Sequence, residues 1–268
     1  MTVPATGRRL VVALPAEDTA IELLGAAAEL AVHLQRECVG LLIESEALVA
    51  AAALPFVRAV PTRSVAVAVF DPAASRRAMR VLAEKARRRL GSRMATTSLR
   101  WSLEIVRGDL GSLSLRAEDL LALGLIDPIG PGGTAAELAL PCPLVMVAGG
   151  AGPVLVLFAG SAETLALGRD LASAEQKPLH VVVVPGGITT AEQLVEQMQQ
   201  ALGGQQGGAT VLHPDEGVEI EAVLTAIAPS LVIVDSCGSG SLWRRVVVAL
   251  QGRRLRLDLH QRRLGRSG

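Results

Sequence analysis

The sequence predicts an α/β protein made of two tandem open five-stranded parallel sheets, each flanked by helices. Short runs of β-branched residues alternate with longer Ala-, Leu-, Glu- and Arg-rich segments of helical period, as in strand–helix units on a parallel sheet. The same order of elements occurs twice, with a period near half of the chain. The 268 residues, 50% of them hydrophobic, can form two domains of about 130 residues with their own cores.

The first half contains five predicted strands and three predicted helices. The strands cover residues 9–14, 38–45, 98–108, 120–124 and 143–147, and the helices cover residues 18–36, 71–90 and 134–140. Asp18 or Thr19 suits the N-cap of the first helix, and Asp71 with Pro72 suits the start of the second. Between the third and fourth strands, the helix is shortened to residues 111–119.

The second half repeats this order. Its predicted strands cover residues 153–158, 178–184, 209–213, 231–235 and 254–260, and its predicted helices cover residues 162–176, 189–202, 216–228 and 241–251. The glycine-rich segment 148–153 marks the joint between the two copies. We therefore place the two domains at residues 1–150 and 151–268.

Residues 138–162 are uncharged and long enough to cross a lipid bilayer. Pro141, Pro143 and Pro153, with Gly149, Gly150 and Gly152 in the middle, would leave a spanning helix short of backbone hydrogen bonds. We predict two buried strands joined by a glycine-rich linker instead.

Charge and composition argue against several classes of partner. The 26 basic and 26 acidic residues give a net charge of +0, so no overall field attracts nucleic acid. Aromatic residues make up 2% of the chain and tyrosine is absent, which leaves little for base stacking. Cys38, Cys142 and Cys237 form no CxxC motif, and the N-terminal apolar run is too short for a signal peptide. We expect a cytoplasmic protein.

Three segments carry a resemblance to a known family. They are PVLVLFAGSAETLALGRDLA (153–172), PSLVIVDSCGSGSLWRRVVVAL (229–250) and LPCPLVMV (140–147). They resemble the first strand and turn, the fourth strand with its glycine loop, and the fifth strand of the universal stress protein family. The resemblance implies the strand order 3-2-1-4-5 in each copy. It also implies an internal pseudo-dimer in which strand 143–147 lies beside strand 254–260, with homodimerisation as a further possibility.

The members of this family that bind ATP keep an aspartate after the first strand and a glycine-rich loop after the fourth. In the second copy, Ala159 stands at the aspartate position and Asp235 at that of the first glycine, whereas Gly238 matches. In the first copy, Leu14 replaces the aspartate. The motifs are therefore degenerate, and we expect neither ATP nor AMP as a bound cofactor. The second copy also has Val248 and Ala249 where the motif ends in Gly-Ser. The first copy keeps Gly124 but has Asp127 at the position of the second glycine.

The loop that follows the strand at 231–235 is the candidate ligand site. Its small polar residues lie where an open parallel sheet binds ligands, and their N–H groups with an arginine could hold a phosphate or sulfate. The alternative is a plain strand-to-helix turn capped by Ser241. The candidate ligand-binding residues are Ser236, Gly238, Ser239, Gly240, Ser241 and Arg244.

No catalytic or metal-binding set is found in the sequence. Cys237 would need His213 as its base, from the end of a different strand. His213 with Asp215 and Glu216 provides too few ligands for a metal site. The two acids are more simply explained as complementing the positive end of the following helix. We expect no enzyme activity.

Arginines crowd two segments. They are Arg76, Arg77, Arg80, Arg87, Arg88 and Arg89 in the helix at 71–90, and Arg253, Arg254, Arg256, Arg262, Arg263 and Arg266 at the C-terminus. They form either solvated faces or a contact surface for an acidic partner or anionic lipid headgroups.

Three functions remain open. The leading hypothesis is a non-catalytic tandem protein that acts as a regulatory or scaffold module through protein contacts. The second is a nucleotide or phosphate sensor that uses the loop at 236–241. The third is a cytoplasmic accessory subunit of a membrane transporter or sensor, which would reach the membrane only through that partner.

Overall fold

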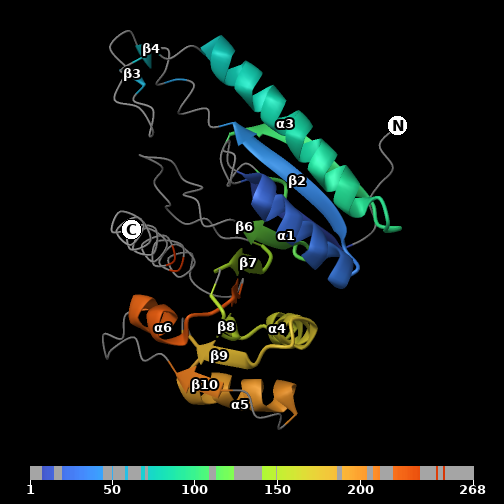
Figure 1. Ribbon diagram of the computed structural model, residues 1–268. Helices are drawn as coiled ribbons and strands as arrows, with labels where there is room; N and C mark the ends of the chain where they lie inside the picture. Colours follow the sequence, from blue (N-terminus) through green and yellow to red (C-terminus); the bar gives the residue numbers. More distant parts are fainter. Residues whose placement is uncertain are drawn as a thin grey trace, which may run out of the picture. The chain divides into compact units, whose positions relative to one another are not determined.

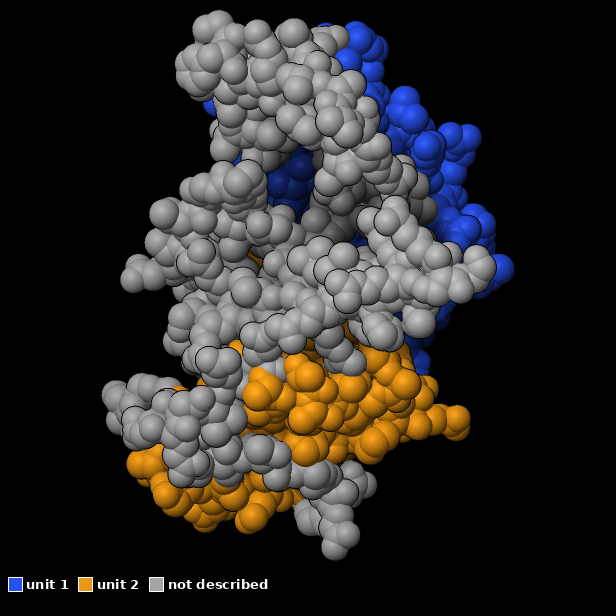
Figure 2. All heavy atoms as spheres, turned by 60° about the vertical axis from the view of Figure 1, so that its left-hand side comes forward, with its two compact units in different colours: residues 1–114, 128–134 blue, residues 115–127, 135–268 orange. Residues whose placement is uncertain are grey.

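The computed structural model shows an α/β architecture with a mostly parallel sheet and flanking helices (Figure 1). The chain divides into two compact units (Figure 2). Unit 1 comprises Met1–Ser114 and Pro128–Thr134, and unit 2 comprises Leu115–Asp127 and Ala135–Gly268. The structure describes residues 8–14, 20–44, 50, 58–59, 68–69, 72–108, 113–123, 141–148, 150–185, 189–203, 208–211, 220–235, 246 and 250.

Unit 1 contains three parallel strands in the order β1-β2-β5, namely β1 (Arg9–Leu14), β2 (Glu37–Glu44) and β5 (Trp101–Arg107). Helices α1 (Ala20–His33) and α3 (Pro72–Met94) lie side by side over one face of these strands (Figure 1). Between β2 and α3, the short strands β3 (Arg58–Ala59) and β4 (Ala68–Val69) form an antiparallel pair.

The core of unit 1 is aliphatic, as the sequence predicts. Helix α3 buries residues at helical spacing toward α1 and the strands, and α1 contributes mainly small side chains. Burying each large aliphatic side chain contributes about 1.5–3 kcal/mol. The buried residues are Met79, Leu82, Ala83, Ala86, Leu90 and Met94 on α3, and Leu24, Ala27, Ala28 and Ala31 on α1.

Unit 2 contains the strand order β10-β9-β8-β11-β7-β6. Its strands are β6 (Leu120–Leu123), β7 (Leu144–Val147), β8 (Val154–Phe158), β9 (Leu179–Val183), β10 (Gly208–Val211) and β11 (Leu231–Val234). Its helices are α4 (Ala162–Ala174), α5 (Ala191–Leu202) and α6 (Ile220–Ile227). Counted from β8, the first four strands of the second copy have the predicted order 3-2-1-4.

Helices cover both faces of the sheet in unit 2. Helices α4 and α5 lie on one face and α6 lies on the other (Figure 1), as expected if the strand–helix–strand connections are right-handed. Strands β8 and β11 are buried at every position, as expected for apolar strands enclosed between two helical layers.

The prediction of two separate five-stranded sheets is wrong. Strands β6 and β7, which the sequence assigns to domain 1–150, pair with each other in unit 2, and β7 also pairs antiparallel with β11. Both edges of β7 are thus occupied, so residues 254–260 cannot pair with it as predicted. Leu144, Val145 and Met146 are fully buried, and an apolar strand of this kind is stabilised by neighbours on both edges. The duplication into residues 1–150 and 151–268 stays a prediction.

Residues 138–162 contain strands β7 and β8, which confirms the prediction of two buried strands in this uncharged stretch. In the described part of the chain, every helix is too short or too polar to span a bilayer.

Several predicted elements lie outside the described residues. They are the helix at 134–140, the strand at 254–260 and the caps Asp18, Thr19 and Asp71; of the helix at 241–251 only Val246 and Leu250 are described, and both are helical and buried. Residues 113–119 contain no helix, so the shortened helix predicted at 111–119 is not found in the described part of that segment.

The segment at 148–153 is bonded along its length to the chain before β11. Ala148, Gly150 and Gly152 each donate a backbone hydrogen bond, to the carbonyls of Ser230, Pro229 and Ala228 at 2.9, 3.1 and 3.1 Å. A Cβ on Gly150 would lie 2.2 Å from the Ala228 carbonyl oxygen, and one on Gly152 would lie 2.5 Å from the same atom. The two backbones approach this closely because both positions are glycine.

We expect Gly152→Ala to destabilise the protein by at least about 2 kcal/mol, since the new methyl group meets backbone carbonyls that cannot rotate away. Urea unfolding followed by circular dichroism measures the loss. Gly25→Ala in α1 is the matched control. A Cβ there meets no atom within 4 Å, so the same substitution should stabilise the helix by about 0.5–1 kcal/mol. Equal stabilities of the two variants would contradict the close approach.

Candidate functional site

The carboxyl ends of β8 and β11 form the candidate site in unit 2. In the order β10-β9-β8-β11, the chain reverses its direction across the sheet between β8 and β11. Ligands of open parallel sheets bind in the crevice outside such a switch point. The residues that leave the two strands here are Ala159 after β8 and Asp235 after β11.

Asp235 is 3% exposed and its carboxylate is hydrogen-bonded to the turn that follows β8. Its Oδ2 atom accepts from the backbone N–H groups of Ala159 at 3.0 Å and Ser161 at 2.8 Å. Its own N–H extends the ladder by donating to the carbonyl of Leu157 at 3.1 Å. The carboxylate therefore occupies two converging backbone donors, the groups that bind anions in many proteins.

The turn after β8 is shaped to present these donors. Gly160 lies between them with φ +127°, a conformation that a side chain would strain. Ser161 is the N-cap of α4, and its Oγ accepts from the N–H of Thr164 at 3.3 Å. The negative charge of Asp235 thus lies at the positive end of the α4 dipole.

Thr164 is the other polar residue buried beneath this turn. It is fully buried, and its Oγ1 has no hydrogen-bond partner among the described residues. Its backbone N–H is shared between the carbonyl and the hydroxyl of Ser161.

The predicted loop site lies outside the described residues. This concerns Ser236, Gly238, Ser239, Gly240, Ser241 and Arg244, as well as Cys237, His213, Asp215, Glu216, Gly124 and Asp127. Of the residues compared with the ATP motif, Ala159 and Asp235 are brought into direct contact, and Leu14 is fully buried at the end of β1.

Sequence reasoning treated Ala159 and Asp235 as two separate losses and missed their contact. The signal was available in the predicted strand order, because the order 3-2-1-4 makes the first and fourth strands neighbours. Residues that follow neighbouring parallel strands meet at the same edge of the sheet.

The described cysteines and histidines form no reactive or metal-binding group. Cys38 and Cys142 are buried, and burial raises the pKa of the Cys38 thiol to about 12. Burial also lowers the pKa of His180, which lies within β9. Within the described ranges, no three His, Cys, Asp or Glu side chains are placed to share a metal ion.

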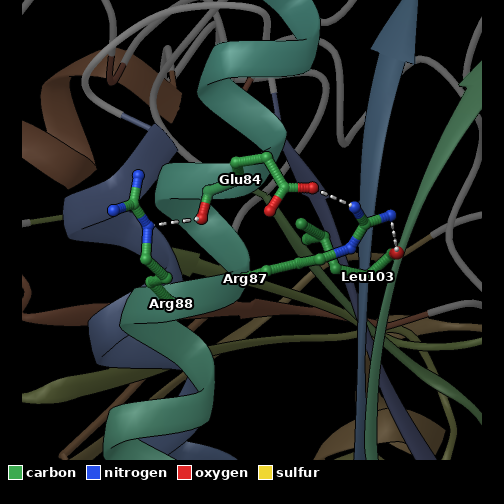
Figure 3. A network of polar contacts seen from close by, with 4 residues as sticks. All are labelled: Glu84, Arg87, Arg88 and Leu103. Carbon is green, nitrogen blue, oxygen red and sulfur yellow. Dashed lines mark hydrogen bonds and ion pairs between the residues drawn. The ribbon is translucent and has the colours of Figure 1, made fainter.

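Helix α3 carries the second candidate surface. It holds eight basic residues and one acidic residue, Glu84, a net charge of +7 in a chain whose total is +0. The arginines predicted to crowd this helix are exposed. Arg87 forms an ion pair with Glu84 at 2.6 Å and donates a hydrogen bond to the Leu103 carbonyl at 3.4 Å (Figure 3). Arg88 donates to the backbone carbonyl of Glu84. The C-terminal arginines lie outside the described residues.

Comparisons with known proteins give structural neighbours only. No family model and no curated protein matches the chain. A universal stress protein from Archaeoglobus fulgidus DSM 4304 is 12% identical, with 85% of this chain and 98% of that chain covered and a TM-score of 0.44. A protein from the universal stress protein family of Burkholderia pseudomallei is 12% identical, with 78% of this chain and 98% of that chain covered and a TM-score of 0.26. A protein from Pseudomonas aeruginosa UCBPP-PA14 that is described under the same family name is 15% identical, with 92% of this chain and 97% of that chain covered and a TM-score of 0.42. Nothing about the site follows from likenesses at this level.

Asp235→Ala should lower the free energy of unfolding by about 2–3 kcal/mol, because the part-buried N–H groups of Ala159 and Ser161 lose a charged acceptor. Asp235→Asn keeps an oxygen in place and removes only the charge, so we expect about half of that loss. Urea titration of both variants measures the difference. A fully stable Asp235→Ala variant would show that these bonds contribute nothing.

Cys38 and Cys142 should not react with a thiol reagent in the folded protein. Both are buried, and a thiol with a pKa of about 12 is only ~0.01% thiolate at pH 8. The measurement uses Cys237→Ser, which leaves these two cysteines, and follows the colour change with Ellman's reagent with and without guanidinium chloride. A fast-reacting thiol in the folded variant would contradict the described core.

Proposed function

We propose that this chain is a tandem universal-stress-type protein that acts without catalysis, as a regulatory or scaffold module, through contacts with other proteins. The strand order β10-β9-β8-β11 supports the family assignment of the second copy. The free thiol of the buried Cys38 supports a cytoplasmic location for the protein.

The observation that carries this proposal is the position of the Asp235 carboxylate. At the switch point of unit 2, the backbone donors that an anionic ligand would use are bonded to the chain's own acid. A phosphate brought to about 4 Å from that carboxylate would be repelled by on the order of 4 kcal/mol at an effective dielectric of about 20, roughly a thousandfold in affinity. A module that has lost its ligand in this way retains its surfaces for binding other proteins.

The second candidate function is a phosphate-ligand sensor. It is favoured by the position of the loop 236–241, whose first residue directly follows Asp235 at the switch point. A ligand held by this loop and Arg244 would have to avoid the Asp235 carboxylate or displace it from Ala159 and Ser161.

Isothermal titration of ATP, AMP and inorganic phosphate into the full chain separates the two functions. We expect no binding at micromolar concentration by the wild type or by Gly240→Val. Micromolar ATP binding that Gly240→Val abolishes would instead establish the sensor and contradict the scaffold.

Cross-linking in the native cell, followed by purification and ligand extraction, tests the scaffold directly. A tandem module that acts through protein contacts should be recovered with the same proteins in repeated preparations and without nucleotide. Recovery of nucleotide alone, with no cross-linked protein, would overturn the proposed function.

A further inference from the structure

Among the described residues, the sheet edge at β5 has backbone hydrogen-bonding groups that no strand pairs with. β5 is the last of the described strands in the sheet order and pairs with β2, with Cys38 opposite Trp101 and Gly40 opposite Leu103. The Cys38 N–H donates to the Arg100 carbonyl, and the Gly108 N–H donates to the Glu44 carbonyl. These two bonds show which alternate residues of β5 direct their backbone groups toward β2. The backbone groups of Trp101, Leu103, Ile105 and Arg107 therefore point away from β2.

One of these outward groups is engaged in the structure. The Leu103 carbonyl accepts from the Arg87 side chain at 3.4 Å, so α3 lies directly beside the open edge (Figure 3). A strand edge of this kind is a template on which another extended chain can pair.

Apolar side chains are exposed at the same place. In the described part of the chain, the large hydrophobic residues that are exposed are Trp101 at 38%, Ile105 at 39% and Val81 at 55%. Two of the three lie on β5, and Val81 lies on α3. Trp101 and Ile105 flank Leu103 on one face of the strand, at the alternate positions whose backbone groups are open. An added strand could contact both side chains while it pairs with the edge.

The charge around this edge selects the partner. Helix α3 carries its net charge of +7 beside β5. Arg100 and Arg107, at the two ends of the strand, are exposed and form ion pairs with Glu37 and Glu44 of β2, so the net positive charge comes mainly from α3. Pairing of two copies through β5 would bring two such helices together and is opposed by their repulsion. An acidic chain meets complementary charge instead, because arginine binds carboxylates in bidentate geometry.

We propose that β5 and the adjoining side of α3 form a docking site for an acidic, extended segment of a partner protein, which adds as a further strand at the open edge. Main-chain hydrogen bonds provide the pairing, and Trp101, Ile105 and the α3 arginines provide the selectivity. This inference rests on the proposed function, since it names the kind of protein contact that the module makes.

The test uses the full chain and a fluorescein-labelled peptide of five Val-Glu repeats. Fluorescence anisotropy should show saturable binding of this peptide. A peptide of the same sequence with an N-methyl group on every residue keeps the charge but has both of its edges blocked for main-chain pairing, so it should bind at least about tenfold more weakly. Equal binding of the two peptides would overturn the proposal.

Two variants and one control locate the site. Ile105→Pro removes an outward N–H and leaves the bonds to β2 in place, and it should abolish binding. Arg80→Glu changes a charge two turns before Arg87 on the same side of α3, and it should weaken binding about tenfold. Arg169→Glu on α4 is the matched charge change elsewhere and should have no effect. Equal effects of the two charge changes would contradict this location.

Cys38 reports whether Ile105→Pro is folded, because it lies opposite Trp101 in the β2–β5 register. Its thiol should stay protected in the Cys237→Ser background. If that variant unfolds, Arg80→Glu against Arg169→Glu decides the question. Binding to vesicles of phosphatidylserine and phosphatidylcholine without binding to the peptide would overturn the proposal in favour of a membrane contact.

The cross-linking experiment distinguishes failure of the β5 site from failure of the proposed function. Proteins captured equally by the wild type and Ile105→Pro would overturn the β5 site and leave the proposed function standing. Failure to capture any protein would overturn the proposed function itself.

Discussion

The antiparallel pairing of β7 with β11 is the constraint on which the arrangement of unit 2 depends. It places Leu144 opposite Val234 and Val147 opposite Leu231. Beyond β7, backbone hydrogen bonds from residues 148–153 continue the pairing to residues 228–230, which lead into β11. Because the pair is antiparallel, β7 begins where β11 ends. The chain that enters β7 at Pro143 therefore borders the end of β11 from which Asp235 leaves, and β8 borders it on the other side. The joint between the two copies follows from this pairing, whereas the candidate site follows from the parallel pairing of β8 with β11.

At the switch point of unit 2, two backbone N–H donors are hydrogen-bonded to a side chain of the same chain. A carboxylate at the end of one strand accepts from the turn at the end of its neighbour, where an open parallel sheet usually receives a ligand. An internal acid of this kind needs no translational entropy to be lost on binding, so it competes strongly with a free anion. It also stabilises the start of α4. Loss of a ligand at such a site can therefore coincide with a gain in stability.

In the described part of the chain, the basic residues and the exposed large hydrophobic side chains are concentrated in unit 1. Its interior is mainly aliphatic, whereas the outer side of α3 carries arginine at most turns. The edge strand β5 adds open backbone groups and two partly exposed large side chains, Trp101 and Ile105. Arg87 covers one outward carbonyl, and charged side chains on an edge commonly protect it from pairing with further copies. The same charges leave it open to a chain of opposite sign.

The sequence by itself determined the elements and their order along the chain. Strand and helix periodicity are local properties, so residues 9–14, 153–158 and 231–235 could be identified as strands without knowledge of their neighbours. The strand order of the second copy followed from resemblance to a family. Only the tertiary structure decided that β7 pairs with β11 rather than with residues 254–260, because an apolar strand such as Leu144–Val147 can pair equally well with many others. It also decided that Asp235 bonds to Ala159 and Ser161, which lie 76 and 74 residues away in the sequence. Contacts at such separations depend on how the sheet brings strand ends together, and no local pattern records them.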